Sequence, residues 1–319
     1  MKFGSREICD VVFKAASANQ RVGKRIFAQY QPVFMIDTAR TSTIEQATST
    51  VYAQGGKGYN RLIAWEGEKT VTYTVEDALI SPQGLAVLTG AGVAEASSSA
   101  VQHVHTVLQG TVIKTGTTGN EEYSVSFDLD ALNEELGTAL DSVYVCKTIT
   151  AYGTVLDGSG AGIEFVDSVT IDGTTKTGDD TLIEVKANQD VTFKVGSTYE
   201  GKTVAFDFYV AMDSGVTEIT IRPESLGGYF YVEGDTLYRR EDNGKDMAAT
   251  ITFPKVKVQS AFTLSMSASG DPSTFSFVMD AMPAYTRFDH THKTVCNIQI
   301  VGTDADAAEE ASDEHTHSF

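Results

Sequence analysis

Apolar and polar residues alternate with a period of two along much of the chain, which is the pattern of β-strands with one buried face. The clearest strand is expected within residues 61–76, where Val71, Tyr73 and Val75 share one face and threonines occupy the other. Two earlier strands are expected in the segments ICDVVFKA and QPVFMIDT. The N-terminal part of the chain is therefore expected to be β-structure.

The middle of the chain, residues 101–215, contains a second group of short strands separated by Gly, Asp and Thr turns. They are expected in the segments VQHVHTVLQGTVIK, EYSVSFDL, SVYVCKTITAYGTVL, DVTFKVG and KTVAFDFYVAM. Short strands at turn-bounded intervals predict a small β-sandwich for this region.

A third group of strands begins near Val216, with turns expected at Glu233–Asp235 and at Asn243-Gly244. Residues 260–283 then alternate apolar residues with serines and threonines on both sides of a Gly-Asp-Pro turn. The apolar positions are Phe262, Leu264, Met266, Phe275, Phe277 and Met279. This pattern predicts a hairpin with one face in a core.

Two short helices interrupt the strands. Ser81 is a suitable N-cap, Pro82 fits the first helical position and Gly90 fits the end, which predicts a helix of about two turns. The second helix is expected in the segment DALNEELG, with Asp128 and Asp130 as its N-terminal acids. The calcium-loop pattern that these two acids could begin lacks its glycine and its later glutamate.

The net charge of −19 is concentrated in two regions of the 319-residue chain. Residues 101–215 carry −12 and residues 303–319 carry −6, whereas the flanking regions are close to neutral. Tight nucleic-acid recognition needs Lys and Arg clustered on one face, and this chain shows no such cluster in sequence. An acidic surface repels DNA, which excludes a DNA binder but permits a conduit.

No apolar run approaches the length of a membrane span, and the segment MKFGSREICD lacks the apolar stretch of a signal peptide. Three cysteines are far apart in sequence and odd in number, so we expect buried, reduced thiols rather than disulfides or a metal pair. These are Cys9, Cys146 and Cys296. We therefore expect no membrane partner.

The segment Gly55-Gly56-Lys57-Gly58 raises the question of a phosphate-binding loop. Such a loop has the pattern G-x-x-x-x-G-K-[ST] and opens a helix, so that free backbone amides converge on the anion. Here a glycine follows the lysine, and the next segment has the pattern of a strand. We therefore interpret the residues from Gly55 to Asn60 as a structural loop.

No enzyme signature is found in the sequence, so neither catalytic residues nor a cofactor are expected. The glycine-rich run at residues 158–162 lies between strands and not at a strand-to-helix turn, which argues against a dinucleotide fold. Three H-x-H pairs could each present two imidazoles from a strand, but two ligands do not complete a metal site. They are His103 and His105, His290 and His292, and His315 and His317. No metal site is predicted, and metal binding by these pairs stays open.

The strand-rich flanking regions must either cap their sheet edges or pair them with other chains. A closed ring removes edges, and a head-to-tail interface along the ring axis repeats without closing. A filament of stacked rings would have both features: sheet edges paired within each ring, and an interface that repeats along the axis.

Residues 50–92, TVYAQGGKGYNRLIAWEGEKTVTYTVEDALISPQGLAVLTGAG, and residues 250–302, centred on TITFPKVKVQSAFTLSMSASGDPSTFSFVMDAMP, resemble the tail tube, or major tail, proteins of tailed bacteriophages. The resemblance covers about half of the chain. It implies an all-β fold, a tail-tube-type β-sandwich or barrel with one short flanking α-helix, here interrupted by an inserted β-rich domain. Residues 1–95 and 216–302 would form two halves of the tube domain, with an N-terminal arm, and residues 96–215 the acidic insertion.

The resemblance also implies a function. Copies of the chain would form homohexameric rings stacked into a tube in the virion tail, assembled in the cytoplasm of the bacterial host. The lumen would hold the tape measure protein and later conduct the viral DNA without sequence-specific contact during ejection. Whether the tail contracts stays open, and a contact of residues 96–215 with a tail sheath or an adjacent ring stays an alternative.

Site residues follow from this resemblance. Gly55, Gly56, Lys57, Gly58 and Tyr59 would form an inter-ring or inter-subunit loop. Thr263, Ser265, Ser276 and Asp280 would face the lumen, where small polar and acidic side chains let a polyanion slide. Phe262, Phe275 and Phe277 would pack the core. Residues 303–319 are small and acidic, which predicts a disordered tail.

Two other kinds of function stay open at this point. One is a different virion part, such as a baseplate, tail terminator or capsid decoration protein. The other is a carbohydrate-binding or adhesive β-sandwich module, although the sequence shows no clear aromatic platform. Self-assembly into hollow rods would distinguish a tube protein from both.

Overall fold

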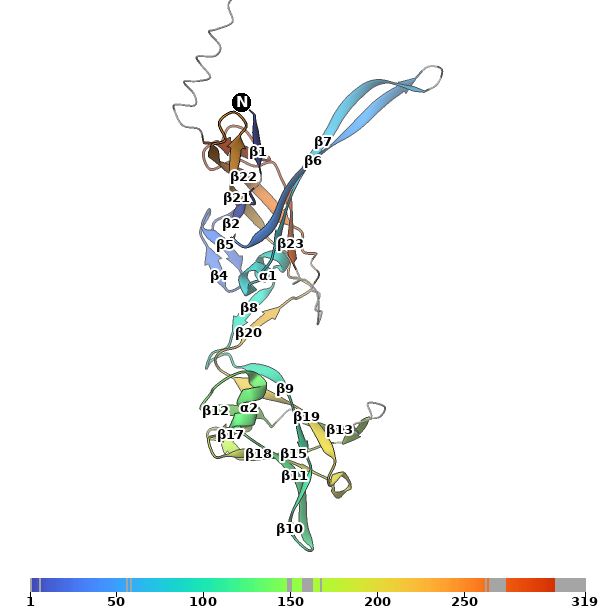
Figure 1. The fold of residues 1–319 in the computed structure, drawn as a ribbon, viewed down its shortest axis with the longest axis vertical. Coiled ribbons are helices and arrows are strands. Elements are labelled where there is room, and N and C mark those ends of the chain that lie inside the picture. Colours follow the sequence, from blue (N-terminus) through green and yellow to red (C-terminus); the bar gives the residue numbers. More distant parts are fainter. Residues whose placement is uncertain are drawn as a thin grey trace, which may run out of the picture. The chain divides into compact units, whose positions relative to one another are not determined.

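The computed structural model describes residues 2–5, 7–55, 57, 59–147, 151–156, 163–166, 168–261, 263 and 274–301. The chain divides into two units: unit 1 comprises Met1–Ala94 with Ile219–Phe319, and unit 2 comprises Glu95–Glu218. Strands make up most of the described residues of both units, which confirms the predicted all-β fold (Figure 1). Among these residues, no helix combines the length and the apolar character that crossing a bilayer would require.

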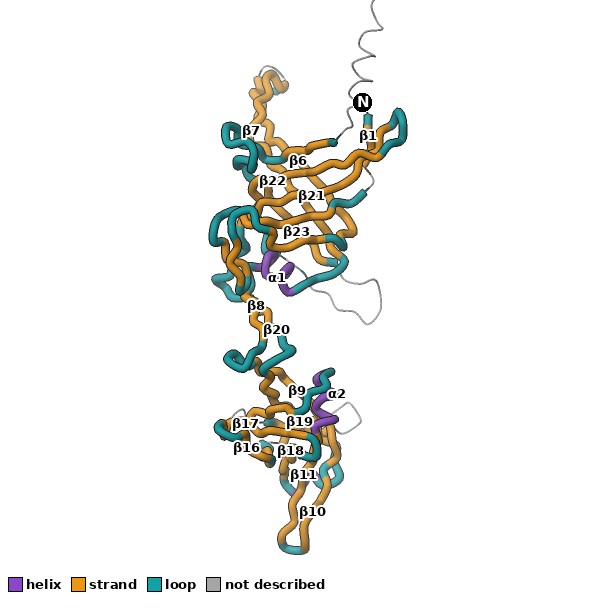
Figure 2. Tube along the Cα trace, turned by 90° about the vertical axis from the view of Figure 1, so that its left-hand side faces the viewer, coloured by secondary structure: helices purple, strands orange, loops and turns teal. Residues whose placement is uncertain are grey.

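Unit 1 is built on a nine-stranded antiparallel sheet. Its strands are β1 (Phe3–Ser5), β2 (Asp10–Ala15), β5 (Pro32–Ile36), β6 (Ala39–Gly55), β7 (Asn60–Asp77), β21 (Tyr229–Arg240), β22 (Asp246–Val258), β23 (Phe275–Ala281) and β24 (Asn297–Ile300). The main order is β5-β2-β21-β22-β23-β7-β6, while β1 pairs with β21 and β24 with β22. Figure 2 labels β21, β22 and β23 in this sheet. Strands from the second half of the chain therefore lie between strands from the first half.

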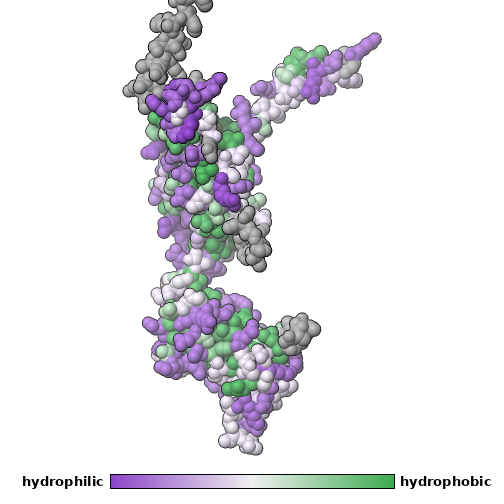
Figure 3. All heavy atoms as spheres, in the orientation of Figure 1, coloured by the Kyte–Doolittle hydropathy of each residue, from purple (hydrophilic) through white to green (hydrophobic). Residues whose placement is uncertain are grey.

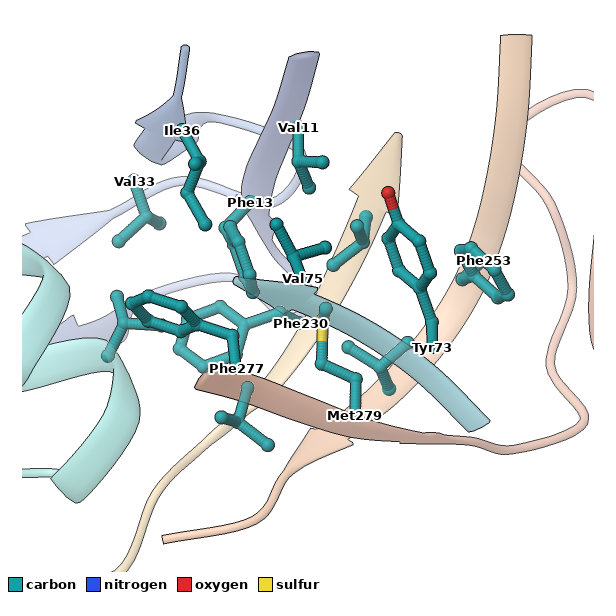
Figure 4. Close-up of a cluster of buried hydrophobic side chains, with 14 of the residues drawn as sticks. Val11, Phe13, Val33, Ile36, Tyr73, Val75, Phe230, Phe253, Phe277 and Met279 are labelled. Atoms are coloured by element: carbon teal, nitrogen blue, oxygen red, sulfur yellow. The ribbon is translucent and has the colours of Figure 1, made fainter. Parts of the chain in front are cut away.

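The sheet curves around an aromatic core. In Figure 4, Phe13, Phe230 and Phe277 point toward one another, and the Phe13 ring lies 5.9 Å from Phe230 and 6.0 Å from Phe277 between centroids. Tyr73 stacks on Phe253 at 4.8 Å. The predicted alternation in β7 is confirmed, because its odd-numbered residues from 71 to 77 are buried and the residues between them are half-buried.

Helix α1 (Pro82–Thr89) covers one side of this core, with the ends that the sequence predicts. The Gly84 N–H donates to Ser81 Oγ at 3.0 Å, and Gly90 takes a left-handed conformation with φ of 70°. A Cβ at Gly90 would lie 2.6 Å from the carbonyl carbon and oxygen of Leu226. Glycine is therefore required there both by its φ angle and by the close approach of the backbone.

Unit 2 contains two sheets that enclose a second core. One sheet has the order β10-β11-β18-β15, and the other has the order β14-β13-β19-β12-β17-β16 with β9 paired to β19. The strands are β9 (Gln102–Thr111), β10 (Ile113–Thr117), β11 (Asn120–Asp128), β12 (Ser142–Cys146), β13 (Tyr152–Leu156), β14 (Ile163–Val166), β15 (Thr170–Asp172), β16 (Thr174–Lys176), β17 (Asp179–Lys186), β18 (Asp190–Val195) and β19 (Thr203–Met212). Phe127, Phe193 and Phe206 pack at its centre.

Helix α2 (Leu129–Leu136) lies against the strands of unit 2 and confirms the second predicted helix. Asp128 is its N-cap, accepting from the Ala131 N–H at 2.9 Å, and Asp130 lies in its first turn. The remaining described elements are a 3-10 helix (Ser197–Tyr199), the pair β3 (Gln20–Val22) with β4 (Arg25–Phe27), and the pair β8 (Gly92–Glu95) with β20 (Thr217–Thr220).

The structure corrects three expectations. Glu233–Asp235 lies inside the continuous strand β21 and is not a turn. A Cβ at Gly234 would lie 3.3 Å from the Tyr73 hydroxyl and 3.4 Å from Cys9 Cβ, so the glycine marks a close packing contact. Cys9 and Cys146 are buried free thiols as expected, but Cys296 is only half-buried.

The third correction concerns β6, which the sequence analysis did not predict as a strand. It is 17 residues long and pairs with β7 along its length. In the hairpin predicted within residues 260–283, β23 forms as expected, with Phe275 and Phe277 buried. Phe262, Leu264 and Met266 lie outside the described residues, as do residues 158–162 and 303–319.

Candidate assembly surface

The β6–β7 hairpin continues beyond the sheet of unit 1 as a two-stranded arm (Figure 1). Only residues 71–77 of β7 also pair with β23, and β6 is the last strand of the sheet. Residues 47–55 and 60–70 are therefore paired only with each other, and we call this pair of segments the arm. A two-stranded ribbon without a covering layer gains little stability from burial in the isolated chain.

The arm exposes large apolar side chains. Val51 lies opposite Trp65, and Ala53 opposite Ile63, so these four residues share one face. The exposed fractions are 63% for Val51, 55% for Ile63 and 53% for Trp65. Figure 3 shows hydrophobic residues between hydrophilic ones along this part of the molecule. The arm therefore has an apolar face that is largely exposed to solvent.

The other face of the arm is more polar and is held by a cation–π contact. The Arg61 guanidinium carbon lies 4.2 Å from the centre of the Tyr52 ring. Register shifts after Thr48 and after Ala53 mark irregularities in the ladder, which increase the twist of such a ribbon. The arm therefore presents one apolar and one polar face along a twisted ribbon.

The sequence-predicted loop lies at the tip of the arm. Gly55 ends β6, Lys57 is exposed, and Tyr59 is 80% exposed with a positive φ of 50°. Gly56 and Gly58 lie outside the described residues. The tip joins two strands and opens no helix, so the geometry of a phosphate-binding loop is not formed there.

Of the four residues expected to face a lumen, Ser276 and Asp280 lie on β23. Ser276 and Asp280 are half-buried on the face opposite the core, Thr263 is exposed, and Ser265 lies outside the described residues. The Asp280 carboxylate accepts from Gln259 Nε2 at 3.1 and 3.0 Å. The structure therefore brings Ser276 and Asp280 onto one face of one strand.

This face extends over two further strands. Asp280 pairs with Thr72 and Ser276 with Glu76 on β7, and Thr72 pairs in turn with Glu45 on β6. The same face carries Thr43 and Thr74 between them. Val278 lies on it as well, opposite Thr74, and the other residues are threonines, a serine and carboxylates. We call the set of Thr43, Glu45, Thr72, Thr74, Glu76, Ser276 and Asp280 the acidic threonine face. The sequence analysis did not predict β6, although residues 41–51 are rich in threonine and other β-branched residues, which favour strands.

The histidine pairs do not form a metal centre in the described part of the chain. His105 Nε2 lies 3.0 Å from Asp207 Oδ1, and His292 Nδ1 lies 3.4 Å from Asp289 Oδ2. Hydrogen bonds from the hydroxyl and N–H of Thr291, and from the His292 N–H, hold the pKa of Asp289 well below its usual range. Among the described residues no group of three potential ligands is assembled; His315 and His317 lie outside them.

Comparison with protein-family models places the chain beside known proteins. The model of the YomU/Tube protein family matches residues 25–159 and 124–295, two segments that overlap and together extend from β4 to the residue before Cys296. They include the arm, the acidic threonine face and unit 2. No curated protein matches the chain.

Proposed function

The chain belongs to the YomU/Tube protein family, so it is a phage tube-related structural protein and a virion component, and we propose that it is the subunit of a tail tube. Its copies form stacked hexameric rings. The lumen holds the tape measure protein and conducts DNA during ejection, and the subunits assemble in the host cytoplasm. This work is mechanical and includes no catalytic step.

The exposed arm is the observation that carries this proposal. A monomer gains no stability from holding Val51, Ile63 and Trp65 in water, whereas a neighbouring subunit that covers them removes apolar area at roughly 25 cal/mol per Å². Strand β6 also leaves its outer backbone groups available for pairing with another chain. We assign the arm, with Gly55–Tyr59 at its tip, to contacts between subunits or rings.

The acidic threonine face supports the assignment of the lumen. Asp280, Ser276, Thr263 and Ser265 line the channel in this proposal, together with Glu45 and Glu76 from the neighbouring strands. Carboxylates repel the phosphates of DNA, and threonine hydroxyls stay hydrated, so the polymer passes without a specific contact. Unit 1 is then the tube domain and the acidic unit 2 an inserted domain that a tail sheath would contact.

The test compares the assembly of purified full-length variants by negative-stain electron microscopy and sedimentation velocity. The wild-type chain is expected to form hollow rods or hexamers. Trp65→Asp places a charge in the proposed contact and is expected to leave monomers, because burying a carboxylate without a partner costs several kcal/mol.

Phe165→Asp is the matched control, since Phe165 is an exposed aromatic residue of unit 2 with an exposed fraction of 68%. This variant is expected to assemble like the wild type. Rods of normal appearance from Trp65→Asp would contradict the role of the arm. A wild-type chain that stays monomeric at high concentration would contradict the tube itself.

A further inference from the structure

Unit 1 contains a groove of about 600 Å³ that the proposed tube function does not use. It is lined by the segment from Ala16 to Gly23, the loop before β5, the end of α1, the start of β21, and part of the loop after β23. Three tyrosines contribute to its walls: Tyr30, Tyr229 and Tyr285. Arg21, Lys255 and His290 also line it, and none of the lining residues is Asp or Glu.

At least one lysine or arginine lies over the ring of each tyrosine of the groove. Lys255 Nζ lies 4.3 Å and Lys257 Nζ 5.3 Å from the centre of the Tyr229 ring. The Arg287 guanidinium carbon lies 5.6 Å from the Tyr30 ring, and Lys293 Nζ lies 5.9 Å from the Tyr285 ring. The Lys257 ammonium also donates to the Gly227 carbonyl oxygen. A tyrosine ring holds a cation by its face, so the N–H groups of Lys255, Arg287 and Lys293 stay available for a ligand.

The positive charge of the groove is not neutralised by neighbouring carboxylates. Among the described residues, Arg21, Lys255, Arg287 and Lys293 make no ion pair, whereas other cations of unit 1, such as Lys14 and Arg239, pair with acidic side chains. A concave site with aromatic walls and several unneutralised cations is complementary to an acidic, extended peptide. Such a site is unexpected in a chain with a net charge of −19.

Residues 302–319 have the matching chemistry. This segment, GTDADAAEEASDEHTHSF, contains six acidic residues and no Lys or Arg, and its other residues are mostly small. The acids occur in three pairs, which lets several carboxylates reach cations spread along a groove.

The segment also starts within reach of the groove. The Val301 N–H donates to the Ala248 oxygen on β22 at 2.8 Å, and Lys255 lies further along the same strand. The distance from Ala248 to Lys255 is about 23 Å at roughly 3.3 Å per residue. Because β24 is antiparallel to β22, the chain leaves Val301 in the direction away from Lys255, so the segment has to reverse its direction to reach the groove. A chain of the length of residues 302–319 spans up to about 60 Å when extended, which is enough for a turn and the return.

We propose that the groove of unit 1 binds the acidic segment 302–319 of the same chain. Carboxylates of the segment pair with Arg21, Lys255, Arg287 and Lys293, and its small residues pack against the tyrosine rings. The segment then neutralises a cationic site that would otherwise attract other polyanions, including DNA.

The experiment uses a chain that ends at Val301 and a fluorescent peptide of residues 302–319. Anisotropy at about 50 mM NaCl is expected to show saturable binding that weakens at least about tenfold at about 500 mM NaCl, because salt screens exposed ion pairs. Lys255→Glu and the exposed-site variant Arg21→Glu are each expected to weaken binding at least about tenfold. Circular dichroism and the melting temperature, compared with those of the full-length chain, check that the shortened chain and both variants are folded.

Three controls make the result specific. Lys147→Glu, at an exposed lysine of unit 2, should leave peptide affinity unchanged. A peptide with all six acids replaced by their amides should not bind. The full-length chain should bind the added peptide at least about tenfold more weakly than the truncated chain, because its own segment competes at a high effective concentration.

Several results would overturn the proposal. They are the absence of saturable binding up to about 1 mM peptide, equal affinity of the wild type and both groove variants, equal affinity for the amide peptide, or equal affinity of the full-length and truncated chains. Binding of a short single-stranded oligonucleotide but not of the peptide would also overturn it. Rod formation is scored separately, so failure of this proposal is distinct from failure of the tube assignment.

Discussion

Gly90 determines where α1 ends and how closely the helix end approaches Leu226, in the segment before β21. Its φ of 70° is unfavourable for other residues, and a Cβ would meet the Leu226 carbonyl at 2.6 Å. We expect Gly90→Ala to lower the free energy of unfolding by about 1–3 kcal/mol, measured by chemical denaturation. Gly92→Ala is the control, since a Cβ there meets no atom within 4 Å, and it should change stability by less than about 0.5 kcal/mol.

Tyr73 buries a hydroxyl group in the core of unit 1. Its oxygen has no hydrogen-bond partner among the described residues, and burial, followed by the nearby Cys9, raises the pKa of Tyr73. Tyr73→Phe removes the buried polar group and keeps the ring on Phe253, so the free energy of unfolding should stay equal or rise by up to about 1 kcal/mol.

The comparison variant at this position is Tyr73→Ala, which should cost about 3–5 kcal/mol because it leaves a cavity. Both variants are measured by denaturant unfolding. A large loss of stability in Tyr73→Phe would show that the hydroxyl has a stabilising partner.

Asp289 links stability to pH. Its pKa is depressed in the folded chain, so its stabilising contribution is present above the unfolded pKa near 3.8 and is lost as the pH falls below that value. The melting temperature should therefore fall between about pH 5 and pH 2.5, and the fall should be smaller in Asp289→Asn. Asp37→Asn removes an exposed carboxylate without a hydrogen bond in the described residues and should keep the wild-type slope.

At the scale of elements, helix ends were predictable from sequence, and strand partners were not. Ser81, Gly90 and Asp128 act on backbone groups within a few residues, so each end of α1 and the start of α2 could be identified locally. Strand β6 was missed because its outer part buries no apolar face, and period-two alternation detects only buried faces.

A variant without the arm tests whether this segment serves assembly and not folding. Thr50 and Glu66 are opposite each other, so an Asn-Gly turn can replace residues 51–65, whose described members are exposed or half-buried. The shortened chain should keep its denaturation midpoint within the equivalent of about 0.5 kcal/mol and should form no rods. A loss of cooperative unfolding, or persistent rods, would contradict the view that this segment serves contacts between subunits.

At the scale of the whole molecule, charge is distributed according to region. Unit 2 and the segment 302–319 carry most of the negative charge, while unit 1 combines a carboxylate-bearing sheet face with a cationic groove. The net charge of each region argued against a DNA-binding protein, but it could not reveal the cationic groove. Arg21, Lys255 and Arg287 are far apart in sequence, and only the fold brings them to the same tyrosine-lined surface.

The sequence by itself determined the all-β class, most of the strands, both helices and the tube-related family resemblance. These properties depend on alternation, capping and turn residues, which act over a few positions. Only the tertiary structure decided that β21 runs unbroken through Gly234, that β6 and β7 form an arm, and that β21, β22 and β23 lie between β2 and β7. The physical reason is that strand pairing and close packing join residues more than a hundred positions apart, and no local pattern encodes which partner a strand will meet.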